Sequence, residues 1–234
     1  TSSDYGVTWT PRAGGREWYH VSISSSGQYQ TAVVYGGQIW LSSDYGVSWS
    51  ARESSRNWVS ISISSTGQYQ TAANGNEYLY ISSDFGITWT ARMTDSGRNW
   101  THAGMSMSAT GQYQSAIVYN TSNNSFGFIY SSSDFGVTWT ARMTDANRNW
   151  TNISLSGTGQ IQLGLEQSTI FTSTNYGITW TRRSTATRTN AFTRIKSSAS
   201  GQYQLATSGP VGTPYGQFYR SEEHTSELQS RQYL

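Results

Sequence analysis

The chain has 234 residues and a formal net charge of +2, and 35% of its residues are hydrophobic and 14% aromatic. So small a charge does not indicate nucleic-acid binding, and no apolar run reaches the roughly 18 residues of a membrane-spanning helix. The absence of cysteine excludes disulfides and cysteine-based metal sites. The length suits one domain, in which aromatic side chains must provide much of the buried surface.

One eight-residue motif recurs five times along the chain. It reads SSDYGVTW in its first copy, and its third position is Asp4, Asp44, Asp84, Asp134 and Asn175. Successive copies therefore lie 40, 40, 50 and 41 residues apart. A second signature, Gly-Gln-x-Gln, recurs in step at Gly27, Gly67, Gly111, Gly159 and Gly201. A period of about 40 residues is typical of one β-propeller blade.

Within each unit, apolar and polar residues alternate with period two, which predicts four short strands, A to D. In the second unit these strands are NWVSISIS from Asn57, QYQTAA from Gln68, EYLYIS from Glu77 and ITWTAR from Ile87. Helical solenoids need helix-period spacing and parallel β-helices need a shorter repeat, so neither fits. The pattern predicts an all-β propeller of five four-stranded blades.

The first and last units are each incomplete and complement one another. Residues 2–12 supply a motif and a D strand, whereas the last unit supplies A near Phe192, B near Gln202 and C near Gln217. The D strand Val7 to Arg12 is therefore predicted to complete the last blade and to close the ring. The alternative is that the chain is a segment of a longer repeat array.

A different kind of sequence follows Tyr219, where another copy of the motif is expected. The string RSEEHTSELQS, residues 220–230, resembles one reading frame of a short-read sequencing adapter. We therefore assign residues 1–219 to one propeller domain and 220–234 to a non-native tail of a metagenomic or transcriptomic read. The alternative is a short C-terminal helix through Glu222, Glu223, Glu227, Leu228 and Gln229.

The motif Ser-x-Asp-x-Gly-x-Thr-Trp resembles the Asp-box, or BNR repeat, of the sialidase superfamily. This resemblance implies that the motifs lie on the edge of each blade remote from the active-site face. In a C–D turn the aspartate can accept backbone N–H bonds, the glycine can take positive φ, and the tryptophan can anchor the turn. We expect this structural role, rather than metal binding or catalysis, for Asp4, Gly6, Trp9, Asp44, Gly46, Trp49, Asp84, Gly86, Trp89, Asp134, Gly136, Trp139, Asn175, Gly177 and Trp180.

The D–A connections and B–C loops are expected to share the opposite face, which is the predicted binding surface. Arginines recur there in pairs, such as Arg142 with Arg148 and Arg182 or Arg183 with Arg188, and could hold anionic groups by forked hydrogen bonds. The predicted ligand-binding residues are Arg52, Arg56, Arg92, Arg98, Arg142, Arg148 and Arg188. The alternative, favoured for most of them, is that each arginine stacks on an aromatic ring or pairs with a neighbour such as Asp95 or Asp145.

Catalytic residues are poorly represented on this surface. A glycosidase needs two suitably placed carboxylates or a tyrosine and a carboxylate, and the best single candidates, Glu77 and Glu166, fall near B–C loops of different blades. The sequence therefore predicts a noncatalytic binding module for a glycan or protein, with no cofactor, metal, nucleic acid or membrane span. The alternatives are a sialidase-like glycoside hydrolase and a segment of a larger adhesin or scaffold array. Oligomeric state and compartment stay open, with an extracellular location as one alternative.

Overall fold

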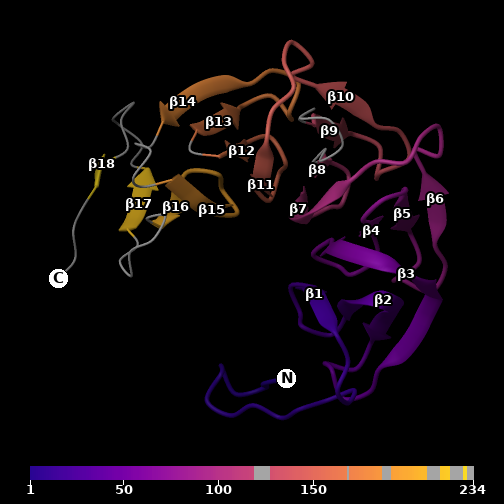
Figure 1. Cartoon of the computed structure of the whole chain (residues 1–234). Coiled ribbons are helices and arrows are strands. Elements are labelled where there is room, and N and C mark those ends of the chain that lie inside the picture. The colour runs from indigo at the N-terminus through magenta and orange to yellow at the C-terminus, as the bar shows by residue number, and fades with distance from the viewer. Residues whose placement is uncertain (119–126, 168, 186–190, 210–216, 222–228, 231–234) are drawn as a thin grey trace. The chain divides into compact units, whose positions relative to one another are not determined.

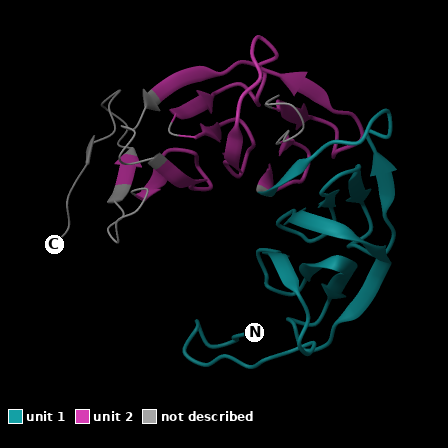
Figure 2. Cartoon of the chain, in the orientation of Figure 1, with its two compact units in different colours: residues 1–102 teal, residues 103–234 magenta. Residues whose placement is uncertain are grey.

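The computed structural model describes residues 1–118, 127–167, 169–185, 191–209, 217–221 and 229–230, and this part of the chain is all-β (Figure 1). The described residues contain no helix, and hence none long and apolar enough to cross a membrane. They form two compact units, residues 1–102 and 103–234 (Figure 2). The all-β prediction is confirmed.

The first unit contains one antiparallel sheet of six strands in chain order. Its long third strand pairs with the second through Leu41 and Ser50, and with the fourth through Ile63 and Gln70. This strand therefore combines the expected D strand of one repeat with the A strand of the next. The strands are β1 (Trp18–Ile23), β2 (Gln30–Ser42), β3 (Ser50–Ile63), β4 (Gln70–Asn74), β5 (Leu79–Ser82) and β6 (Thr90–Arg92).

Three four-stranded sheets follow; the first two match the four strands expected in one repeat, and the third matches only the expected A, B and C strands. The first comprises β7 (Trp100–Met107), which begins in the first unit, β8 (Gln114–Val118), β9 (Ile129–Ser132) and β10 (Thr140–Arg142). The second comprises β11 (Trp150–Leu155), β12 (Gln162–Glu166), β13 (Thr169–Ser173) and β14 (Thr181–Thr185). The third comprises β15 (Ala191–Ser197), β16 (Gln204–Gly209), β17 (Gln217–Ser221) and β18 (Gln229–Ser230). The blade count of five stays a prediction.

The tryptophan that begins an A strand lies in two of the three hydrophobic clusters of the described residues, and Phe192 takes its place in the third. Trp58 is fully buried and meets Tyr80 edge to face at 5.0 Å, and Trp150 meets Phe171 in the same way at 5.4 Å. Aliphatic side chains such as Ile61 pack around these pairs. Successive residues of a strand point to opposite faces of the sheet, and inner strands such as β4 and β8 are buried on both faces.

The predicted closure of the ring by the N-terminal segment is not confirmed. Residues 7–12 belong to no strand, and Val7 and Trp9 are largely exposed. The edge of β17 that they were expected to complete is paired with β18 instead, through Tyr219 to Ser230 and Arg220 to Gln229. No sheet is closed by the N-terminal segment. The alternative helix falls largely on residues 222–228, outside the described residues, and Gln229 lies in β18.

Candidate functional site

The Asp-box turns use their polar groups within the motif itself. Asp84 Oδ1 accepts bonds from Thr88 N at 2.9 Å and Ser82 Oγ at 2.7 Å, and Asp84 Oδ2 accepts from Thr88 Oγ1 at 2.5 Å. Ser82 Oγ in turn accepts from Gly86 N at 2.9 Å, where φ is +83°. Trp89 Nε1 donates to the Gly86 carbonyl at 3.0 Å. This is the turn chemistry that the motif predicts.

These bonds hold the box aspartates in their charged form. The hydrogen bonds from the side chain and backbone of Ser48 lower the pKa of Asp44 to about 2. Burial alone would raise the pKa of Asp84, but its bonds from Thr88 and Ser82 outweigh burial and lower it. The fifth copy has Asn175, whose Oδ1 accepts from Thr179 N at 2.9 Å. Within the described residues, no group of three or more His, Cys, Asp or Glu could hold a metal ion.

Two of the predicted ligand-binding arginines are held in forked ion pairs inside their D–A loops. Arg98 NH2 lies 2.7 Å from Asp95 Oδ2, and Arg148 NH2 lies 2.6 Å from Asp145 Oδ2. In each pair, NH1 bonds to the other carboxylate oxygen. The same NH1 atoms donate to backbone carbonyls, including that of Met143 at 3.0 Å from Arg148. The guanidinium N–H groups of Arg98 and Arg148 therefore stabilise the conformation of their own D–A loops.

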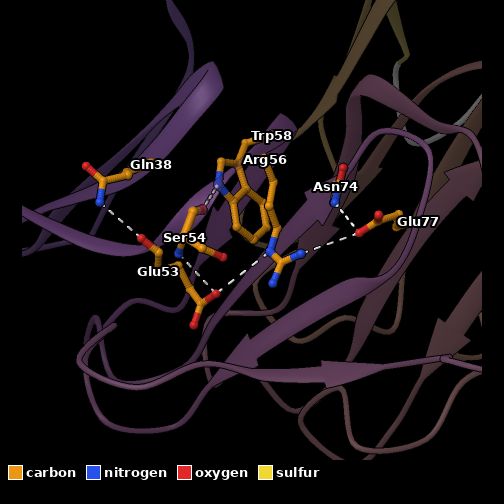
Figure 3. A network of polar contacts seen from close by, with 7 residues as sticks. All are labelled: Gln38, Glu53, Ser54, Arg56, Trp58, Asn74 and Glu77. Carbon is orange, nitrogen blue, oxygen red and sulfur yellow. Dashed lines mark hydrogen bonds and ion pairs between the residues drawn. The ribbon is translucent and has the colours of Figure 1, made fainter.

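A third predicted arginine, Arg56, lies between two glutamates (Figure 3). Its guanidinium is 3.9 Å from Glu53 Oε2 and 3.6 Å from Glu77 Oε2, and it lies 4.9 Å from the ring centroid of Tyr80. Asn74 Nδ2 donates to Glu77 at 2.7 Å. Glu77, one of the two candidate catalytic carboxylates, is therefore paired with an arginine and an amide.

Three further predicted arginines lie in D strands: Arg52 within β3, Arg92 at the end of β6 and Arg142 at the end of β10. Arg52, Arg92 and Arg142 are half-buried, and NH1 of Arg52 and of Arg92 donates to the carbonyl of the preceding alanine at 3.0 Å. Arg188 lies outside the described residues. Such contacts are expected if these arginines stabilise the fold by bonding to their neighbours. A direct role of the arginines in ligand binding stays a prediction.

A polar cavity of about 420 Å³ opens at the end of the β11–β14 sheet that is remote from its Asp-box. Glu166 ends β12, Thr169 begins β13 after a tight turn, and Gln167 in that turn donates its N–H to the Asn149 carbonyl at 3.3 Å. The B–C turn is thereby tied to the D–A connection. The lining residues are Arg148, Glu166, Gln167, Thr169, Phe171 and Arg182.

Glu166 is the carboxylate of this cavity and has an electrostatic environment unlike that of the boxes. Burial raises its pKa, while the charges of Arg148 and Arg182 oppose the rise. Arg148 Nε is 4.0 Å from Glu166 Oε2, and the Arg148 guanidinium lies 5.7 Å from the ring centroid of Phe171. Burial is thus the dominant influence on this carboxylate.

The cavity of Glu166 combines several kinds of polar group. It brings together a carboxylate, an amide, a hydroxyl and guanidinium groups beside an aromatic ring. A raised pKa would suit Glu166 as a general acid, but a glycosidase also needs a nucleophile or base opposite that acid. Its described lining supplies no second carboxylate.

Comparison with known proteins adds the following findings. The family model of the BNR/Asp-box repeat matches residues 80–91, and no curated protein is similar enough to match. A GH74 enzyme from Niastella koreensis superposes with a TM-score of 0.67 at 14% identity, covering 94% of this chain and 38% of that one. The GH74 xyloglucanase of Xanthomonas campestris gives 0.66 at 12% identity over 92% and 38%. YCF48 bound to D1 peptide gives 0.62 at 16% identity over 94% and 74%.

The matched segment is the third box with the strands on either side of it. These findings support a BNR-type β-propeller. At identities this low, the structural likenesses show the fold alone, and this propeller chain spans about two fifths of the length of each GH74 protein.

Sequence reasoning singled out three of the cavity residues in this propeller and missed the others. Glu166 was a candidate carboxylate, and Arg148 and Arg182 belonged to the arginine pairs. Gln167 lies in the B–C turn and Thr169 begins β13 after it, in a segment whose sequence differs from those of the other repeats. Phe171 could have been found by alignment, because it holds the place that Tyr80 holds in the second repeat.

Proposed function

We propose that the chain is a noncatalytic β-propeller module that binds a glycan or a protein through the end of its sheets formed by D–A and B–C loops. The cavity at the β11–β14 sheet carries this proposal. Its lining comes from the D–A connection at Arg148, the B–C turn at Gln167, and strand residues such as Arg182. A pocket built from these connections matches the surface on which binding is expected.

The polar groups of this cavity favour a ligand rich in hydroxyl or amide groups over a simple anion. The NH1 and NH2 groups of Arg148 are occupied by Asp145 and by loop carbonyls, so they are not arranged to grip an incoming carboxylate. Glu166 offers acceptor oxygens, and Gln167 and Thr169 can both donate and accept. A sugar residue or a polar peptide side chain meets these requirements.

The structural neighbours are compatible with both ligand classes. Two of them are GH74 enzymes, one a xyloglucanase, and a third is YCF48 bound to D1 peptide. Such neighbours support a propeller scaffold that can present either kind of site, and the choice of ligand rests on the chemistry of the cavity.

An array experiment tests this proposal. The full chain, labelled at its N-terminus, is applied at modest salt to printed neutral and acidic glycans and to a peptide array. We expect saturable binding to a restricted set of compounds, and the Glu166→Gln variant should lose it. Signals that never exceed background on both arrays would remove the proposal.

Measurement of glycoside turnover tests the alternative that the chain is a glycoside hydrolase. The chain is incubated with a panel of fluorogenic glycosides that includes sialosides, and no release of fluorophore is expected. Release that the Glu166→Gln variant abolishes would favour a hydrolase instead. The third alternative, a longer adhesin or scaffold array, would be favoured by further Asp-boxes upstream in the source gene.

A further inference from the structure

We propose that Gln167 determines which ligand the Glu166 cavity accepts, and that it selects the side-chain carboxamide of a peptide. Gln167 lies in the turn between β12 and β13 and lines this cavity. The inference rests on the proposed binding at the cavity, and it adds one specificity-determining residue and one chemical group of the ligand.

The backbone of Gln167 has a conformation that is unfavourable for a glutamine. Glu166 pairs with Thr169, so that two residues connect β12 to β13. The φ of Gln167 is +46°, and a positive φ is typical of the first position in such two-residue hairpin turns. Glycine, asparagine and aspartate are the usual residues at this position, because other side chains are strained there. The glutamine therefore lowers the stability of its own turn.

The second repeat shows that the fold does not need a glutamine at this place. Glu166 and Asn74 each lie opposite the tryptophan that begins the A strand of their repeat. The next residue is Gln167 in one repeat and Gly75 in the other. The backbone N–H of each donates to the carbonyl of the asparagine that precedes this tryptophan, at 3.3 Å for Gln167 and 2.8 Å for Gly75. A residue without a side chain thus makes the same backbone bond.

The second repeat also shows which groups pair at this end of a sheet. Its longer B–C turn carries Glu77, which lies 3.6 Å from Arg56 and accepts a bond from Asn74 Nδ2 at 2.7 Å (Figure 3). A carboxamide is therefore bonded to a carboxylate beside an arginine. In the fourth repeat the carboxylate is Glu166 beside Arg148, and a ligand can supply the carboxamide.

The lining of the cavity matches the donors and acceptors of a carboxamide. Glu166 offers acceptor oxygens, Gln167 offers one acceptor and two N–H donors, and Thr169 offers a hydroxyl. A ligand carboxamide can donate one N–H to the carboxylate and exchange bonds with the Gln167 side chain. A ligand carboxylate would lack these donors and would add a second negative charge near Glu166.

The aromatic ring of the cavity is covered, which disfavours a sugar ring as the ligand. Phe171 is 7% exposed, and the Arg148 guanidinium lies 5.7 Å from its ring centroid. The other side chains that line the cavity are polar. The cavity therefore offers little surface against which the C–H groups of a pyranose could be buried.

Capped pentapeptides that differ in one residue test the selected group. They read acetyl-Gly-Ser-X-Ser-Gly-amide, where X is glutamine, asparagine, glutamate or leucine, and isothermal titration into the full chain measures their affinity. We expect the glutamine or the asparagine peptide to bind, and the glutamate and leucine peptides to bind at least about tenfold more weakly, because these leave polar groups of the cavity unpaired. Equal affinity for all four peptides, binding of methyl glucoside in their place, or no binding of any of these probes would overturn the choice of a carboxamide.

The variant Gln167→Gly separates the strain of the turn from its part in binding. Glycine suits the positive φ, so the midpoint of thermal unfolding should rise by about 2–4 °C. Affinity for the amide peptide should fall at least about tenfold, because the carboxamide that pairs with the ligand is gone. Ala13→Gly is the matched control, since Ala13 has a φ of +61° and does not line the cavity. This control should leave the affinity unchanged.

The same variant distinguishes a failure of this inference from a failure of the proposed function. If the wild type binds its array compounds and Gln167→Gly binds them equally well, Gln167 does not determine specificity and the proposed binding module still stands. A fall in the thermal midpoint of Gln167→Gly would likewise assign the glutamine to the fold. A wild-type chain that binds nothing on either array would remove the proposed function, and this inference with it.

Discussion

At the box end of the β11–β14 sheet, polar groups bond within eight consecutive residues, whereas at the pocket end they converge from separate strands and loops. Asn175 is engaged by Ser173 at 3.0 Å and by Thr179 at 2.9 Å. Glu166, in contrast, lies 4.0 Å from Arg148 Nε and lines an open cavity. The motif that repeats most clearly is locally satisfied, and the place that can accept a ligand is formed by residues far apart in sequence.

The first box shows how local this turn is. Asp4 accepts from Thr8 N at 2.9 Å and from Ser2 Oγ at 2.7 Å, as in the other copies, although this segment lies outside any strand. Trp9 is nevertheless 73% exposed, while Trp89 packs against the core around Trp58. The residues of the motif therefore form the turn by themselves, whereas burial of the tryptophan requires packing against a sheet.

The largest effect is expected from a glycine at the box end. In Gly177→Ala the added Cβ would lie 2.7 Å from Gln162 Oε1 at a residue whose φ is +79°. Strain and overpacking together should lower the free energy of unfolding by about 2–4 kcal/mol, measured in urea. Gly6→Ala is the matched control, because φ is similar but the nearest neighbour is Trp9 at 4.0 Å. An equal loss in both variants would contradict a role for sheet packing.

A smaller effect is expected from Asn175. Asn175→Ala removes the acceptor for Thr179 N and should lower the free energy of unfolding by about 1 kcal/mol. Asn175→Asp restores the residue of the other four boxes and should stay close to the wild type. Both values come from urea unfolding at neutral pH. A larger loss in the aspartate variant than in the alanine variant would show that the turn needs more than an acceptor oxygen.

The pocket end should behave in the opposite way. Glu166→Gln keeps the shape of the side chain and removes a charge that is costly to bury, so the free energy of unfolding should change by less than about 0.5 kcal/mol. Its ligand binding should nevertheless be lost. Thermal unfolding followed by circular dichroism measures the stability of the variant, and the array measures its ligand binding. Marked destabilisation would assign Glu166 to the fold instead of the site.

The smallest effects should appear in the pH dependence of the free energy of unfolding. The contribution of the box aspartate is lost on acidification, and that of Glu166 is lost as the pH rises. Burial alone would raise the pKa of Asp134, but its bonds from Thr138 and Ser132 lower it overall. Its stabilisation is thus present above about pH 4 and is lost as pH falls through the lowered pKa. The pKa of Glu166 is raised, so its contribution favours the folded state below the ordinary value and is lost as pH rises through the raised one.

Urea midpoints across the acid range measure these two contributions. Asp134→Asn should lose less stability than the wild type on acidification, because the titrating group is gone. Glu166→Gln should gain stability relative to the wild type on going from acid to neutral pH. Identical acid profiles for Asp134→Asn and the wild type would show that the bonds in this box do not favour the charged form.

The repeat spacing was enough to predict the strands and the box turns, because both depend on neighbours in sequence. Thr88 and Asp84, for example, are four residues apart. The predicted pairing of residues 7–12 is not confirmed, and the edge of β17 is paired with β18, a contact with no periodic signal. The pocket was only partly predictable, since Thr169 and Arg148 meet through the fold and belong to no shared motif.

Binding measured at both ends of one sheet tests the separation of structure from function most directly. Isothermal titration with the array compound that gives the strongest signal is carried out on the wild type, Glu166→Gln and Asn175→Asp. We expect binding to be lost in Glu166→Gln and unchanged in Asn175→Asp, with both variants folded. Loss of binding in Asn175→Asp together with normal binding in Glu166→Gln would place the ligand at the Asp-box and contradict the account.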